Sequence, residues 1–90
     1  MDPGARKRQK EQLLRDIEAW KKRRSERGFQ DIVRNALDLE LKYMRDLMRV
    51  FGVDRDEIRK WTAGKLAPPD FQQGDIIEQL HDSIEKDINA

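Results

Sequence analysis

Three basic side chains, Arg55, Arg59 and Lys60, follow one another closely in the middle of the chain. Arginine can donate two hydrogen bonds to the O6 and N7 atoms of guanine, and both arginine and lysine bind phosphate oxygens. The only large apolar residues interleaved with these cations are Ile58 and Trp61, three residues apart. A helix with this pattern buries one narrow face and presents its cations on the other. The pattern therefore fits either contact with nucleic acid or a solvated helix face with salt bridges to Asp56 or Glu57.

Glycine and proline residues predict where this helix begins and ends. Gly52 makes a tight turn after an amphipathic segment, and Asp54 followed by Glu57 has the spacing of a capping box. Gly64 ends the helix, so its expected span is 54–63, and two prolines close the unit. Two helices joined by a glycine turn, the second short and polar on one face, predict a helix-turn-helix. The second helix of that motif has the size to enter the major groove of DNA.

The segment from Ile58 to Pro68 resembles the recognition helix and following loop of the phage-repressor-like (Cro/C1-type, lambda-repressor-like) helix-turn-helix family. Proteins of that family typically read Gly-Val, then Ser or Thr, Ile, Trp, a Gly-Lys and a Pro. The resemblance covers residues 42–69, under a third of the chain. It implies an all-α fold, a compact four- to five-helix bundle that binds double-stranded DNA as a homodimer on a two-fold site.

The resemblance also implies roles for individual residues. Arg55, Asp56 and Lys60 fall at positions where the family reads bases. Arg59 falls near the groove wall, and Lys65 falls in the loop that meets phosphate. Buried packing positions of the family correspond to Leu47, Phe51, Val53, Ile58 and Trp61.

Several residues depart from the family pattern. Met44 stands where a phosphate-binding glutamine is usual, and Met48 stands where a small alanine is usual. The recognition helix begins with three carboxylates within 54–57, which phosphate repels unless they are paired or accept from a cytosine amino group. An alternative function therefore stays open: a protein-interaction module, such as an adaptor or anti-repressor, that does not read DNA. Its protein partner would bind through the C-terminal helix.

Length and composition predict a single domain. The chain has 90 residues, of which 37% are apolar and 41% charged, so it can build one small core. The expected parts are a disordered basic arm over 1–8, a basic helix over 9–27, the helix-turn-helix core over 29–69 and an acidic C-terminal segment over 70–90. The arm could reach into a groove or serve only as a solubilising tail.

Glycine and aspartate residues predict helix boundaries inside these parts. Gly28 is expected to end the first helix, and the last helix is expected over about 75–88. Apolar residues keep one helical phase from 29 to 51, which fits either one long helix or two helices with a break near Asp38. Asp38 would then cap the second of the two.

Charge and apolar stripes suggest two further contacts. Residues 1–27 carry ten basic and five acidic side chains, whereas residues 66–90 carry one and six. The basic head, together with Lys65, is expected to give DNA binding a salt-dependent component. Two apolar stripes could either fill the core or pair with a second subunit: Leu13, Ile17 and Trp20, and Ile77, Leu80, Ile84 and Ile88.

Other chemistry finds little support in the sequence. There is no cysteine, and His81 is the only histidine, expected at the surface beside Asp82. No nucleophile, metal-ligand pair or glycine-rich phosphate loop has a recognisable spacing, so we predict no enzyme activity, no metal and no cofactor. Apolar runs of two or three residues and the absence of a signal peptide predict no membrane contact and a cytoplasmic protein, bacterial or phage-encoded and nucleoid-associated.

Overall fold

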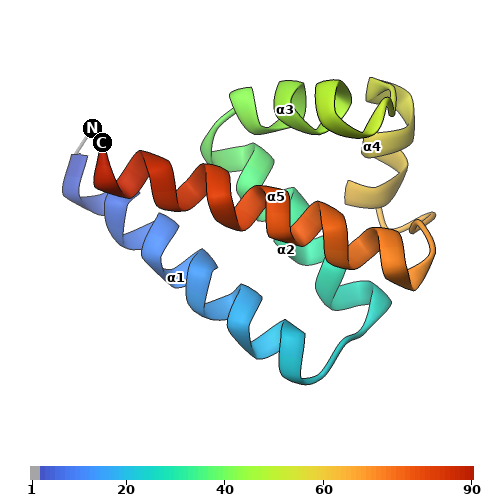
Figure 1. Ribbon diagram of the computed structural model, residues 1–90, viewed down its shortest axis with the longest axis horizontal. Coiled ribbons are helices and arrows are strands. Elements are labelled where there is room, and N and C mark those ends of the chain that lie inside the picture. Colours follow the sequence, from blue (N-terminus) through green and yellow to red (C-terminus); the bar gives the residue numbers. More distant parts are fainter. Residues whose placement is uncertain (1–2) are drawn as a thin grey trace.

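The computed structural model describes residues 3–90 and folds them into five helices (Figure 1). These are α1 (Pro3–Lys22), α2 (Glu26–Leu39), α3 (Lys42–Phe51), α4 (Arg55–Thr62) and α5 (Asp70–Asn89). The radius of gyration is 12.4 Å, which matches the value of about 12 Å for a compact domain of this length. The predicted all-α class and helix number are confirmed.

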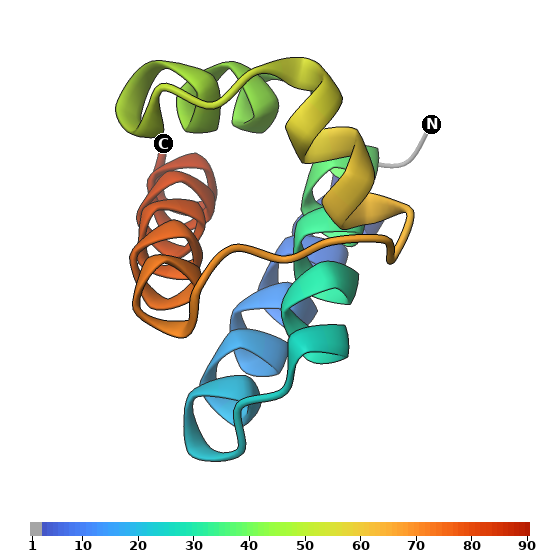
Figure 2. The ribbon, with the colours of Figure 1, turned by 90° about the vertical axis from the view of Figure 1, so that its right-hand side faces the viewer.

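The five helices form a bundle with α4 at its edge. Figure 1 shows α1 and α5 running side by side, and both also contact α2. Within residues 3–90, α4 contacts α2 and α3 but neither α1 nor α5. Figure 2 shows α4 and α5 on opposite sides of the molecule, joined by the segment 63–69. The outer face of α4 is therefore not covered by α1 or α5.

No helix in the described part of the chain is long and apolar enough to cross a membrane.

A single core fills the space between the helices, and it takes up both apolar stripes. Its buried apolar members are Leu13, Ile17, Trp20, Phe29, Ile32, Val33, Ala36, Leu37, Tyr43, Leu47, Val53, Ile58, Trp61, Ile76, Ile77, Leu80 and Ile84. Every large residue of the two stripes is therefore inside the fold, except the partly buried Ile88. Of the two alternatives, the structure contains the first: both stripes fill the core, because α1 and α5 turn these faces toward α2 and toward each other.

The predicted disorder of residues 1–8 is wrong for residues 3–8, whereas Met1 and Asp2 lie outside the described residues. Helix α1 begins at Pro3, a residue suited to the first helical position. Arg6 and Lys10 both reach the Glu40 carboxylate, at 3.4 and 3.3 Å. Because Glu40 is far away in sequence, no local pattern could show that these cations have a partner.

The first helix boundary lies before the predicted one. Helix α1 ends at Lys22, and Ser25 caps α2 by accepting a hydrogen bond from the Gly28 amide at 3.0 Å. Trp20 donates its indole N–H to the Ser25 carbonyl at 2.9 Å. Gly28 therefore lies in the first turn of α2 and does not end α1, because the serine and the tryptophan together hold the turn.

The segment 29–51 contains two helices, as the second of the two readings expected. The break lies at Glu40 and Leu41, and Asp38 stays inside α2, so its predicted role as an N-cap is wrong. Extended backbone at Glu40 ends α2, and no side chain caps α3. The break does not show in the sequence, because the apolar residues on both sides of it keep the same helical phase.

The last helix begins at Asp70, about a turn before the predicted start. Buried Gln73 donates its side-chain amide to the Pro68 carbonyl at 2.8 Å, and its backbone amide donates to the Pro69 carbonyl at 2.9 Å. These bonds close the first turn of α5, so the helix already includes residues 70–74.

Candidate nucleic-acid interface

Two buried side chains anchor α4 and leave its other residues outside. Ile58 and Trp61 are buried, and the Trp61 ring meets Phe29 of α2 edge-on with centroids 5.7 Å apart. At the start of α4 the Asp54 carboxylate accepts a hydrogen bond from the Glu57 amide at 2.8 Å. This is the N-cap that the sequence predicted, and the amphipathic arrangement fixes which face of α4 points to solvent.

Glycines set the two ends of the unit. Gly52 ends α3 in the left-handed region with φ 67°, and Gly64 follows α4 with φ 76°. Residues with a Cβ adopt this conformation only at a cost, so glycine suits both turns. The three residues between α3 and α4 form the predicted turn, so residues 42–62 hold two helices joined at Gly52.

All five predicted site residues are exposed. Arg55 and Arg59 are four residues apart and form one row on α4, and Asp56 and Lys60 form a second row beside it. Lys65 lies in the loop that follows the helix. Among the predicted packing residues, Leu47, Val53, Ile58 and Trp61 are buried, and Phe51 is partly buried against the core.

The cations of α4 have no ion-pair partner among residues 3–90. Arg55, Arg59 and Lys60 lie beyond 4.0 Å from every carboxylate described, including Asp56 and Glu57 on the same helix. A helix face with internal salt bridges was the ordinary explanation for these charges, and the structure does not contain it. Unpaired cations attract anions without having to break an existing contact.

Cations of the N-terminal head are in a different situation. Lys21 lies 3.2 Å from Glu78, and Arg24 lies 3.0 Å from Asp70 while its guanidinium stacks over Trp20. The pKa of Lys21 is raised, chiefly by its hydrogen bond to Glu78. Part of the basic charge of this head is therefore paired inside the molecule.

Helix α2 supplies two cations beside α4. Arg27 and Arg34 line a surface pocket together with the end of α4 and its loop, residues 62–64. The Gln30 amide donates to the Leu66 carbonyl at 2.9 Å and so ties this loop to α2. The predicted DNA-binding residues include neither Arg27 nor Arg34. Their seven-residue spacing, which puts both on one face of a helix, was a usable signal.

No family model, curated protein or solved structure matches the chain. The features that bear on function are thus the geometry and charge of the interface itself.

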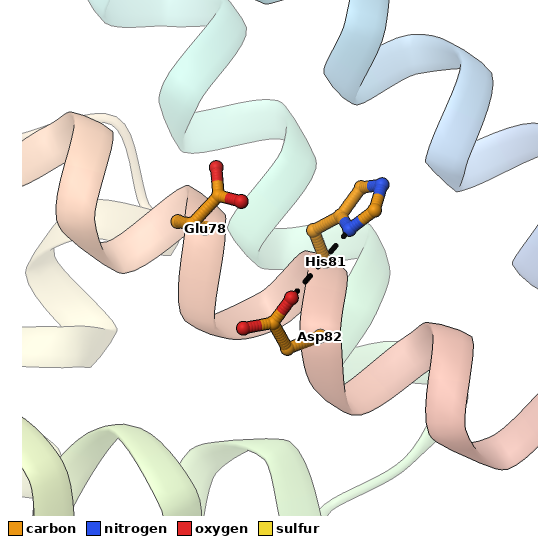
Figure 3. A group of neighbouring side chains, drawn as sticks. All are labelled: Glu78, His81 and Asp82. Atoms are coloured by element: carbon orange, nitrogen blue, oxygen red, sulfur yellow. Dashed lines mark ion pairs between the residues drawn. The ribbon is translucent and has the colours of Figure 1, made fainter.

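The only histidine belongs to a second polar cluster, on α5 (Figure 3). His81 is partly buried, not at the open surface as predicted, and its Nδ1 atom is 3.8 Å from Asp82 and 3.9 Å from Glu85. Its Nε2 atom is 3.7 Å from Glu18 of α1. Glu78, His81 and Asp82 hold ligand-type atoms within 4.8 Å of one another, but Glu78 already pairs with Lys21. A cation bound here would compete with that ammonium group.

Proposed function

We propose that this protein is a sequence-specific, double-stranded DNA-binding transcriptional regulator that reads the major groove with α4. The observation that carries the proposal is the pairing of two features on one short helix. Ile58 and Trp61 anchor its inner face, and its outer face carries the unpaired cations Arg55, Arg59 and Lys60. An eight-residue helix is about 12 Å long, close to the major-groove width of about 12 Å.

The proposed roles follow from the two rows on α4. Arg55 and Lys60 donate to base edges, where arginine favours guanine. Asp56, between them, accepts from a cytosine amino group and is repelled elsewhere, which adds discrimination between sequences. Arg59 and Lys65 contact phosphates and supply affinity that falls with salt.

The regulator acts by occupancy in this proposal. Two copies bind a two-fold site, with recognition helices about 34 Å apart in successive major grooves. Occupied DNA then blocks or recruits the transcription machinery in a bacterial or phage-infected cytoplasm. Since neither apolar stripe is free, contacts between copies would use other surfaces. Within residues 3–90, the exposed large apolar residues are Leu41, Val50, Leu66 and Phe71.

The test is selection of bound duplexes from a random pool at about 0.1 M salt, where the Debye length is about 10 Å. Wild type is compared with Arg55→Ala and with Lys86→Ala, which removes one exposed charge from α5, a helix that does not touch α4. We expect a two-fold-symmetric sequence that Lys86→Ala retains. Arg55→Ala should cost about 1–3 kcal/mol and relax the preference at one position in each half-site. No enrichment with the wild type would refute the proposal.

The alternative is a protein-interaction module that does not read DNA, and one observation favours it. Asp56 and Glu57 are exposed and, among the described residues, as unpaired as the neighbouring cations. A mixed-charge helix of this kind also suits a protein partner with a complementary surface. Capture of one protein by the wild type, lost in Asp56→Ala and kept in Arg55→Ala, together with no duplex selection, would establish it.

A further inference from the structure

A polar stripe on α2 continues the cationic surface of α4. Arg27, Gln30, Asp31 and Arg34 recur at helical spacing and line one pocket with residues 62–64 at the end of α4. Arg27 is exposed and has no ion-pair partner among residues 3–90. This face of α2 thus looks out beside the far end of the proposed recognition helix.

The pocket that the α2 stripe lines also includes Thr62, which extends one of the two rows of α4. Arg55, Arg59 and Thr62 are spaced by four and three residues, so they lie along one side of α4. Thr62 also lines the pocket with Arg27 and Arg34. Four arginines from two helices therefore border one continuous surface.

One carboxylate stands within this surface. Asp31 lies 2.9 Å from the Arg34 guanidinium, with both side chains about half exposed. An exposed pair of this kind contributes about 0–1 kcal/mol. Arg34 can therefore exchange Asp31 for a phosphate oxygen at little cost, and it can also hold both, since guanidinium has five N–H donors.

We propose that Arg27 and Arg34 bind a backbone phosphate of the duplex whose major groove α4 enters. The inference rests on the proposed function and adds the part of the DNA that α2 contacts. Because α4 is about as long as the groove is wide, side chains just beyond its end reach the groove wall, where the phosphates lie. A guanidinium group binds phosphate in a bidentate geometry, through two parallel N–H···O hydrogen bonds. The Gln30 bond to Leu66 holds the adjoining loop in place for this contact.

The salt dependence of binding to the selected duplex tests the inference. Arg27→Gln/Arg34→Gln is compared with Lys86→Gln, which removes a positive charge from an exposed position on α5. Each phosphate contact contributes about 0.9 to the slope of log K against log salt. We expect the first variant to lower the slope by about 0.9, for the one phosphate contact that is lost, and to select the same sequence as the wild type. The control should keep the wild-type slope.

The outcomes separate this inference from the proposed function. A wild type that selects a sequence, with an unchanged slope in Arg27→Gln/Arg34→Gln, would overturn the inference and leave the proposed function standing. A wild type that binds no duplex would overturn both. Replacing single phosphates by neutral methylphosphonates then locates the contact. One replacement should weaken wild-type binding and leave the binding of the double variant unchanged, and a scan in which every replacement affects both proteins equally would also overturn the inference.

Discussion

The side chain of Asp87 joins three helices, and its removal should destabilise the fold by a predictable amount. Its carboxylate accepts hydrogen bonds from the Tyr43 hydroxyl and, at 2.8 Å, from the Lys42 ammonium group of α3. Lys10 of α1 lies 3.7 Å away. Asp87 is 18% exposed and Tyr43 is fully buried, so the Tyr43 bond is shielded from water. The Lys42 side chain is 53% exposed, which weakens its pair.

These exposures decide how much each contact contributes. A hydrogen bond to a charged group is worth about 1.5–3 kcal/mol, and a neutral one is worth about 1 kcal/mol. Asp87→Asn converts the first kind into the second and loses an exposed ion pair worth about 0.5 kcal/mol, so we expect a loss of about 1.5 kcal/mol. Tyr43→Phe keeps the ring packing and should cost a similar amount. Lys42→Met, the control for the exposed pair, should cost under about 1 kcal/mol.

Denaturant unfolding of the wild type, both single variants and Asp87→Asn/Tyr43→Phe closes a double-mutant cycle. We expect a coupling of about 1 kcal/mol, because each single change already breaks the charge-assisted bond. A coupling energy below about 0.3 kcal/mol would show that the hydrogen bond between Tyr43 and Asp87 does not itself stabilise the fold. The reasoning from burial would then be refuted.

The same bond should make stability depend on pH in the acid range. Burial alone would raise the pKa of Asp87, but the hydrogen bonds from Lys42 and Tyr43 and the nearby ammonium groups outweigh it and lower the pKa below its ordinary value of 3.8. Burial, and then the bond to Asp87, raises the pKa of Tyr43, so the phenol stays a donor. The contribution is complete above the unfolded pKa and is lost as pH falls through the lower folded pKa. Wild type should therefore lose its advantage over Asp87→Asn below about pH 4.

Three further changes test how the site and the core are built, each read from the free energy of unfolding. Asp54→Ala removes the cap of α4 and should cost about 1 kcal/mol; a value near zero would mean that α4 does not depend on this bond. Gly64→Ala would place its Cβ in ordinary contact, 3.9 Å from the Gln30 Oε1 atom, but at φ 76°, so about 1–2 kcal/mol is expected. A stabilised variant would contradict the left-handed turn. Ile84→Ala removes part of the core packing and should cost about 2–5 kcal/mol. A variant of unchanged stability that no longer self-associates would instead show that the isoleucine stripe is a subunit interface.

Local signals in the sequence were enough to predict the helix-turn-helix. Gly52 and Gly64 mark its turns, Asp54 provides a cap, and Ile58 and Trp61 define a single buried face. Each of these is a property of a few neighbouring residues, and such properties survive in any tertiary context that keeps the helix amphipathic. The same holds for the all-α class, which follows from apolar residues at helical spacing throughout.

Long-range contacts decided the features that the sequence could not reveal. Glu40 lies within ion-pair distance of Arg6 and Lys10 of α1, so a residue far away in sequence faces the part of the predicted arm that the structure describes. A stripe on one helix looks the same whether it meets its own core or a second subunit, so the burial of Ile84 depended on where α5 packs.

The sequence and the tertiary structure therefore each determine a different part of the candidate interface. The sequence by itself determined which side chains α4 presents, because helical periodicity assigns Arg55, Arg59 and Lys60 to its polar face. Only the tertiary structure decided that these cations lie beyond ion-pair distance of the carboxylates of residues 3–90 and that Arg34 of α2 lies beside the end of α4. Ion pairs depend on distances between helices, and helical periodicity carries no information about those distances.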